Sequence, residues 1–206
     1  MAIISHRYRF IFIKTQKTAG TAIEVTLSPL CGPDDVVTPI IPTEPGHTPR
    51  NYRHGDGDFY NHMPASEIRD RIGVLDFNAY FKFCVERDPV EKCLSHYAML
   101  KHSPHHVRLA GDVASWDRYV ARGRFPIDRR IYTGPDGSLL VDRVLNYERL
   151  EQELHEVMDS LGVPWTGLKS NAKSGFRAGG VPRLEDVTEV QASAIRKAFD
   201  SFPRAR

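Results

Sequence analysis

The segment that decides the fold is FIKTQKTAGTAIE, residues 12–24, where an apolar run leads through a short polar turn into a helix-forming stretch. Residues 8–13 alternate and cluster apolar and aromatic side chains, which predicts a buried strand, and residues 21–27 predict a helix. A strand–turn–helix junction presents backbone N–H groups without intrahelical acceptors at the positive end of the helix dipole. The sequence therefore predicts a point at which an anion can bind.

The turn itself contains side chains that suit an anion. Lys17 supplies a positive charge, Thr18 and Thr21 supply hydroxyls, and Gly20 lets a ligand approach the backbone closely. An ordinary tight turn with a solvated lysine has the same composition, so the pattern alone leaves both interpretations open. The common nucleotide loop GxxxxGK[ST] places its lysine directly after the second glycine, whereas Lys17 precedes Gly20.

The composition of the chain is that of a globular protein. Its 206 residues are 41% hydrophobic and 26% charged, which predicts a single domain over residues 1–206 and argues against a disordered, coiled-coil or membrane protein. The net charge of +2 gives no broad electrostatic reason to bind nucleic acid. Any anion site must therefore be local.

The cysteines and the N-terminal segment predict a reducing compartment. Cys31, Cys84 and Cys93 are odd in number and form no CxxC pair, which argues against a disulfide framework or a structural zinc site. The first apolar run is broken by Arg7, Arg9 and Lys14 and is too short for a signal sequence or a membrane span. We therefore expect a cytoplasmic protein.

A second strand-to-helix unit follows in the middle of the chain. AYFKFCVERDP, residues 79–89, alternates as a strand does until Pro89, which can begin the helix PVEKCLSHYAMLKH, residues 89–102. Residues 29–61, which precede this unit and its preceding helix at 62–73, are rich in Pro, Gly, Asp and His without sustained periodicity. A loop of that length is typically functional or mobile, and we expect it to face the substrate.

The rest of the chain continues the alternation of strands and helices. The pattern predicts a hairpin around residues 134–137, a strand through 144–147, and helices at 112–122, 148–164 and 188–199, with a loop at 167–183. Strands that alternate with helices predict an α/β fold with a parallel sheet and helices on both faces.

Two of these segments together resemble a known enzyme family. QKTAGTA resembles the 5′-phosphosulfate loop of sulfotransferases that use 3′-phosphoadenosine 5′-phosphosulfate (PAPS), and FKFCVERDPVEKCLSHY resembles their 3′-phosphate motif, with Arg87 and Ser95 at the phosphate-binding positions. The segment VDRVLNYERLEQELHEVMDSLGVP is similar to a further strand and helix of the family. The resemblance covers roughly residues 8–163 and is closest to the carbohydrate branch with uronyl and heparan 2-O-sulfotransferases and bacterial relatives.

The resemblance implies a P-loop-like three-layer fold with a central parallel sheet flanked by helices. It also implies transfer of a sulfuryl group from PAPS to a hydroxyl of a carbohydrate or another small polar acceptor, with adenosine 3′,5′-bisphosphate (PAP) as product and no metal. Lys17 would neutralise charge on the leaving phosphate. The other implied contacts of the 5′ end are Thr18, Ala19, Gly20, Thr21 and Ala22.

A hydroxyl acceptor benefits from a general base, and a histidine has a suitable pKa. The long loop and its end contain His47, His54 and His62, and the resemblance favours His62, just before the helix at 62–73, over a histidine that merely caps that helix. The later loop supplies Arg177 and Gly179, which suit a phosphate-contacting flap or a simply exposed loop.

The sequence departs from the family pattern and leaves alternatives open. Gln16 replaces a usual proline, Ala22 a frequent serine, Glu86 an apolar residue and Lys92 a common arginine. A P-loop nucleotide kinase would require ATP, magnesium and a Walker-type lysine, and a non-catalytic nucleotide-binding regulatory protein would retain the fold without turnover. The histidines at 102, 105 and 106 lack recognisable metal-ligand spacing and are better explained as a solvated turn.

Overall fold

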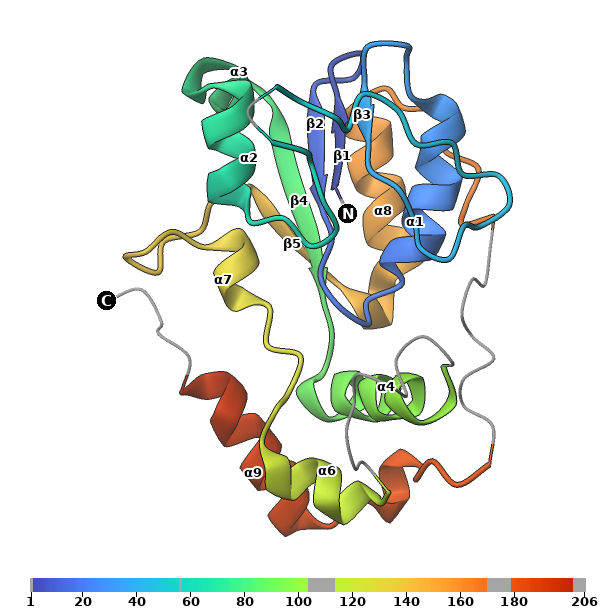
Figure 1. The fold of residues 1–206 in the computed structure, drawn as a ribbon, viewed down its shortest axis with the longest axis vertical. Coiled ribbons are helices and arrows are strands. Elements are labelled where there is room, and N and C mark those ends of the chain that lie inside the picture. The colour runs from blue at the N-terminus through green and yellow to red at the C-terminus, as the bar shows by residue number, and fades with distance from the viewer. Residues whose placement is uncertain (1, 56, 104–113, 170–178, 202–206) are drawn as a thin grey trace. The chain divides into compact units, whose positions relative to one another are not determined.

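The chain forms two compact units in this computed structural model, which describes residues 2–55, 57–103, 114–169 and 179–201 (Figure 1). The first unit comprises Met1–Glu86 and Asp128–Ala172, and the second comprises Arg87–Ile127 and Lys173–Arg206. The predicted single domain over residues 1–206 stays a prediction. In the described part of the chain, no helix is long and apolar enough to cross a membrane.

The first unit is built on a five-stranded mixed sheet with the strand order β3-β1-β2-β4-β5. The strands are β1 (Ala2–Ser5), β2 (Phe10–Ile13), β3 (Val36–Val37), β4 (Phe81–Glu86) and β5 (Arg143–Asn146). β2, β4 and β5 are parallel, with Phe10 opposite Phe81 and Phe83 opposite Arg143, whereas β1 is antiparallel to both β2 and β3. The α/β class is confirmed.

The prediction of a parallel sheet is correct only for β2, β4 and β5. Only residues 6–9 connect β1 to β2, and a connection that short joins antiparallel strands, because parallel strands need a crossover of about a dozen residues. The sequence interpretation treated the N-terminal apolar residues as one interrupted run and missed this hairpin.

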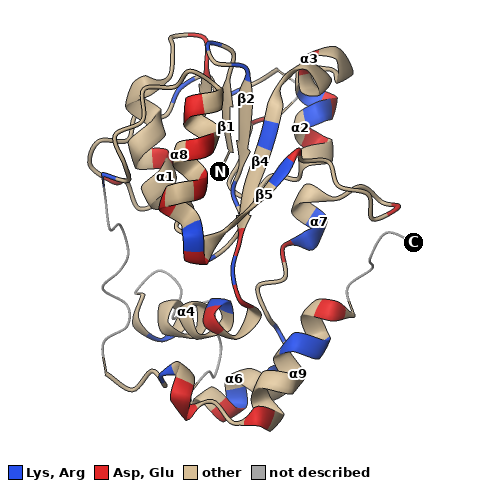
Figure 2. Cartoon of the chain, turned by 180° about the vertical axis from the view of Figure 1, so that it is seen from behind, with Lys and Arg blue, Asp and Glu red and all other residues tan. Residues whose placement is uncertain are grey.

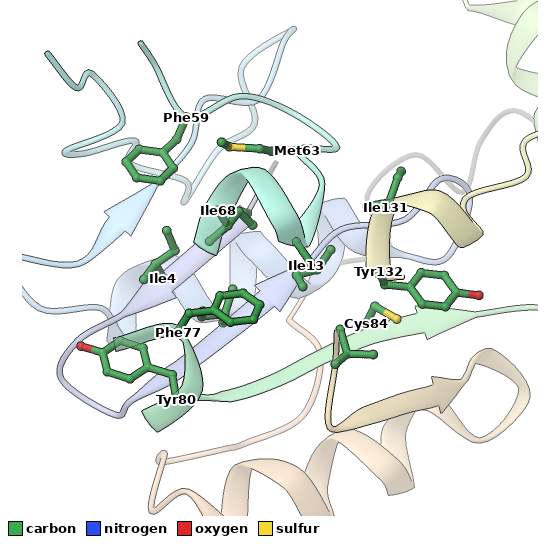
Figure 3. Close-up of a cluster of buried hydrophobic side chains, with 14 of the residues drawn as sticks. Ile4, Ile13, Phe59, Met63, Ile68, Phe77, Tyr80, Cys84, Ile131 and Tyr132 are labelled. Atoms are coloured by element: carbon green, nitrogen blue, oxygen red, sulfur yellow. The ribbon is translucent and has the colours of Figure 1, made fainter. Parts of the chain in front are cut away.

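Helices cover both faces of this sheet (Figure 1). The helices of the first unit are α1 (Gly20–Leu27), α2 (Ala65–Ile72), α3 (Val74–Ala79), α7 (Arg129–Tyr132) and α8 (Leu150–Ser160), with 3₁₀ turns η1 (Ser28–Leu30) and η2 (Tyr147–Arg149). Ile11 and Ile13 face a cluster shared with α2, α3 and α7, whereas Phe10 and Phe12 face a cluster shared with α1 and α8. Figure 3 shows the first of these clusters. The alternation along β2 therefore buries the strand on both faces.

The second unit is helical. It contains α4 (Pro89–His102), α6 (Trp116–Arg122), η4 (Leu184–Asp186) and α9 (Glu189–Asp200). Its core holds an aromatic cluster in which the rings of Trp116 and Tyr119 stack at 5.2 Å and Tyr97 meets Trp116 edge-on. The predicted helix at 89–102 is confirmed, and Asp88 caps it by accepting hydrogen bonds from the N–H groups of Val90 and Glu91.

The long segment at 29–61 is tied to the first unit. The Arg50 guanidinium donates to the carbonyls of Cys31 and Gly32 at 2.9 and 3.2 Å and to that of Ser28 at 3.2 Å, and so satisfies carbonyls at the end of α1 and η1. Phe59 is buried in the cluster under α2. The segment contains the short strand β3. That residues 29–61 face the substrate stays a prediction.

Candidate functional site

The residues between β2 and α1 form a loop with an alternating backbone conformation. The angle φ is +60° at both Lys17 and Ala19, whereas Thr18 and Gly20 are not in the left-handed region. Such alternation turns successive N–H groups toward one concavity. The first intrahelical bond of α1 runs from the Ile23 N–H to the Ala19 carbonyl at 3.1 Å, so the N–H groups before it have no intrahelical acceptor. The geometry is that of an anion-binding backbone.

Hydroxyl groups fix this loop from inside. The Thr15 hydroxyl donates to the carbonyl of Val85 on β4, and the Thr18 hydroxyl donates to the Thr15 carbonyl at 3.1 Å and lies 2.9 Å from the Thr15 hydroxyl. Thr15 and Thr18 are both buried. The Thr18 hydroxyl therefore holds the loop together, and any contact of Thr18 with a ligand falls to its backbone.

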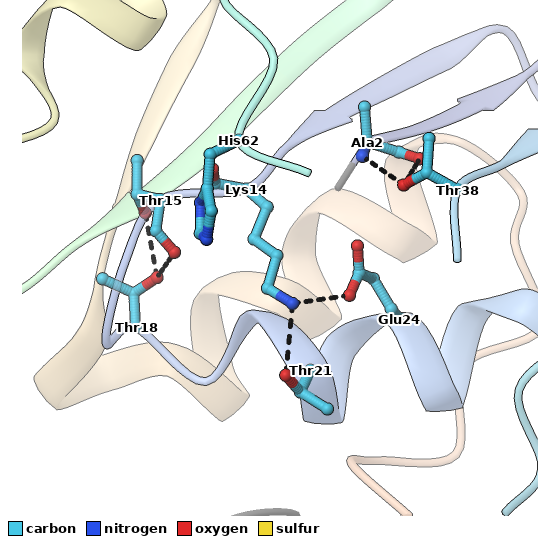
Figure 4. A network of polar contacts seen from close by, with 8 residues as sticks. All are labelled: Ala2, Lys14, Thr15, Thr18, Thr21, Glu24, Thr38 and His62. Carbon is cyan, nitrogen blue, oxygen red and sulfur yellow. Dashed lines mark hydrogen bonds and ion pairs between the residues drawn. The ribbon is translucent and has the colours of Figure 1, made fainter. Parts of the chain in front are cut away.

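A buried lysine network lies under the start of α1 (Figure 4). The Lys14 ammonium is 2.9 Å from a carboxylate oxygen of Glu24 and 3.1 Å from the Thr21 hydroxyl. Lys14 is 7% exposed and Glu24 is 0% exposed. The sequence interpretation missed both residues. The available signal was the spacing of Thr21 and Glu24. Residues three apart share one face of a helix, and this helix follows closely on the end of the buried strand.

The position of the Lys14 side chain requires a glycine at position 20. A Cβ at position 20 would lie 2.5 Å from Cγ, 2.6 Å from Cε and 2.9 Å from Cδ of Lys14. The close neighbour of Gly20 is therefore the Lys14 side chain, and the predicted approach of a ligand to this backbone stays a prediction.

His62 contacts the same loop from a distant part of the sequence. Its Nδ1 lies 3.0 Å from the Lys14 carbonyl, and because a carbonyl only accepts, Nδ1 carries the hydrogen and Nε2 is the unprotonated nitrogen. Burial lowers the pKa of His62 to about 4, and the Lys14 charge adds to the effect, so the ring is neutral at pH 7. The next residue, Met63, is fully buried and fixes this part of the backbone.

The other two candidate histidines differ in their surroundings. Burial, with the charges of Lys14 and Arg50, lowers the pKa of His47 to about 4. The exposed ring of His54 meets Phe59 edge-on at 6.0 Å. His62, in turn, hydrogen-bonds the carbonyl of Lys14 in this loop.

Gln16 connects the loop to the start of α7. Its backbone N–H and its side-chain amide donate to the two carboxylate oxygens of the buried Asp128, at 2.6 and 3.0 Å. A proline at position 16, as the resemblance would favour, has no N–H and would lose the first bond. No local pattern could have revealed Asp128, because it lies 112 residues away.

The predicted 3′-phosphate residues lie in the second unit. The Arg87 guanidinium pairs with the Glu91 carboxylate, and Ser95 follows one helical turn after Glu91 on α4. Gly179 is exposed, and Arg177 lies outside the described residues. Glu86, the departure before Arg87, hydrogen-bonds Tyr132; burial raises the pKa of that phenol, and Glu86 adds to the shift.

Charges and metal ligands do not by themselves define the site. Figure 2 shows mainly acidic residues along α8 and both signs along α9. Among the described residues, no group of three or more His, Cys, Asp or Glu side chains is arranged to hold a metal ion. The three cysteines are buried thiols that form no disulfide bond.

Comparison with known proteins connects the chain to an uncharacterized archaeal protein. No protein-family model matches the chain, and no solved structure matches it. The chain is 32% identical over 105 residues to an uncharacterized protein of Archaeoglobus fulgidus, an alignment that covers 50% of this chain and 84% of the archaeal protein. At this identity and coverage, the chain belongs to the same protein family as that archaeal protein.

Proposed function

We propose that the protein is a PAPS-dependent sulfotransferase that acts on a hydroxyl of a carbohydrate or another small polar acceptor. The single observation that carries the proposal is that His62, a neutral histidine with an unprotonated Nε2, hydrogen-bonds the loop whose backbone at residues 17–20 suits an anion. Parallel strands with helices on both faces are in keeping with the P-loop-like fold that the sequence resemblance implies.

The 5′ end of the donor would bind at the start of α1. Lys17 and Ala19 are partly exposed, whereas Thr18, Thr21 and Ala22 are buried, so the loop apex is its accessible part. Backbone N–H groups and the helix dipole favour an anion there. Lys17 would neutralise the charge that builds on the bridging oxygen as the leaving phosphate departs.

His62 would act as the general base. In the reaction the acceptor oxygen bonds to sulfur, the bond from sulfur to the bridging phosphate oxygen breaks, and the acceptor proton moves to His62 Nε2. The hydrogen bond from Nδ1 to the Lys14 carbonyl holds the required tautomer. The anionic donor would raise the proton affinity of the ring once it is bound.

The assignment of the 3′-phosphate to Arg87 and Ser95 rests on the sequence resemblance. A guanidinium has five N–H donors and suits a phosphate dianion, and the carboxylate of Glu91 would compete with the phosphate for them. Gly179, together with Arg177 outside the described residues, belongs to the same proposal. The buried thiols suit a reducing compartment, so a cytoplasmic location is also proposed.

Isothermal titration calorimetry with PAP and with ATP, each with and without magnesium, tests this function. We expect PAP to bind without magnesium and more tightly than ATP, because the loop lacks the Walker lysine position. Preference for magnesium-ATP would indicate a kinase, and no binding of either nucleotide would refute the proposal.

Two variants then separate an enzyme from a nucleotide-binding regulator. Lys17→Ala should weaken PAP binding and abolish transfer, whereas His62→Ala should keep PAP binding and lose transfer. Lys197→Ala on the exposed part of α9 is the matched control for loss of a positive charge. Transfer to a verified acceptor that survives both site changes would contradict the mechanism.

A further inference from the structure

The first unit buries two lysines, and their surroundings differ. The Lys82 ammonium donates to the carbonyls of Phe77 and Tyr80 at 3.1 and 2.6 Å, and pairs with the half-exposed Asp142, so it satisfies the end of α3. Lys14 is equally buried but turns its ammonium to the opening turn of α1, where it contacts Thr21 and Glu24. The ammonium of Lys14 has no role in the function proposed above.

The contacts of Lys14 determine where the Thr21 hydrogen points. An ammonium has only donors, so in the 3.1 Å contact the Thr21 oxygen must accept. The hydroxyl hydrogen of Thr21 therefore points away from Lys14. In the part of the chain that the structure describes, this hydroxyl has no other hydrogen-bond partner, and it lies in the second position of α1 beside the outward N–H groups.

We propose that Lys14 is a positioning residue that makes the Thr21 hydroxyl an obligate donor to the anion bound at the start of α1. This inference rests on the proposed function. Glu24 holds the ammonium at 2.9 Å, and the missing side chain of Gly20 leaves room for the lysine stem. Lys14 thus fixes two hydrogen positions. Its ammonium orients the hydroxyl hydrogen of Thr21, and its carbonyl keeps the ring hydrogen of His62 on Nδ1.

A purely structural role would not require these charges. Two buried charges lose their hydration, and an apolar pair of similar volume is often equally stable in such a place. A neutral pair at positions 14 and 24 would pack similarly but would leave Thr21 free to turn its hydrogen inward. The directed hydrogen is what the charged network adds.

A double-mutant cycle on PAP affinity tests this role. Thr21→Val should weaken PAP binding about 10- to 100-fold, the usual loss of a hydrogen bond to a charged group. Lys14→Met combined with Glu24→Met removes both charges without changing the net charge, and should itself weaken binding. Adding Thr21→Val to that pair should then cause much less than its wild-type loss, because the directed donor is already gone.

Lys82→Met is the matched control, since it removes an equally buried lysine from the same unit, and it should leave the affinity unchanged. If the losses of PAP affinity from Thr21→Val and from the charge-free pair simply multiply, the inference is overturned and the proposed function stays intact. A wild-type protein that does not bind PAP would overturn both. Neutron diffraction of the wild-type PAP complex needs no variant to fold. It should show the Thr21 deuterium directed at a phosphate oxygen, and a deuterium directed at a protein acceptor would refute the inference.

Discussion

Gly20→Ala should destabilise the protein even though alanine is the better helix former. In a helix that has room for a methyl group, this change gains up to about 1 kcal/mol. Here the new Cβ would lie 2.5 to 2.9 Å from three carbons of Lys14. Those carbons belong to the Lys14 side chain, whose ammonium is paired with Glu24. The side chain can therefore move aside only if its ammonium leaves the Glu24 carboxylate.

The magnitude follows from that withdrawal. Breaking a buried ion pair costs about 3–5 kcal/mol, and the helix preference returns up to about 1, so we expect Gly20→Ala to lower the free energy of unfolding by about 2–4 kcal/mol. In a Lys14→Ala background the obstacle is absent, and the same change should raise that free energy by up to about 1 kcal/mol. Urea unfolding followed by circular dichroism measures all four corners of the cycle. A Gly20→Ala variant that is more stable than the wild type would refute the packing argument.

Three further changes test other parts of the site. Ala19→Gly should stabilise the protein by about 1 kcal/mol in urea unfolding, because it removes the strain of an alanine in the left-handed conformation. The control Ala22→Gly inside α1 should destabilise the protein by a similar amount. Equal effects of the two changes would contradict the conformation assigned to Ala19. Because the pKa of His62 is lowered from 6.5 to about 4, the unfolded chain takes up this proton first as the pH falls, so stability is lost between about pH 6.5 and 4. His62→Gln should show a smaller loss between pH 7 and 5, and an unchanged loss would argue against the low pKa. Glu91→Gln should tighten PAP binding up to about fivefold in calorimetry by removing a competitor for Arg87; weaker binding would mean that Glu91 instead positions the arginine.

Local signals predicted helices at the positions of α1, α2, α4, α6, α8 and α9, whereas the short helices α3 and α7 were not predicted. Asp88 and Pro89 mark the start of α4, and Pro64 and Gly73 flank α2 as its caps. Such signals act within a few residues, so a single sequence contains them. The same holds for the strand, turn and helix around residues 12–24, and for His62 just before α2.

The remaining features depend on contacts between distant residues. The pairing of β1 with both neighbours makes the sheet mixed, and the apolar run at its start does not reveal a direction. The burial of Lys14 depends on Glu24 and on the space at Gly20, and the loop also relies on Asp128. Polar residues that pair across the fold leave no periodic trace, so lysine at the end of a strand looked like the end of a hydrophobic run.

The most direct test of the account is a crystal structure of the protein with PAP bound. We expect the 5′-phosphate to lie within hydrogen-bond distance of the backbone N–H groups of residues 18–22 and of the Lys17 ammonium, with His62 Nε2 facing the position of the missing sulfuryl group. A nucleotide bound away from this loop, or a His62 ring turned away from the 5′ end, would contradict it.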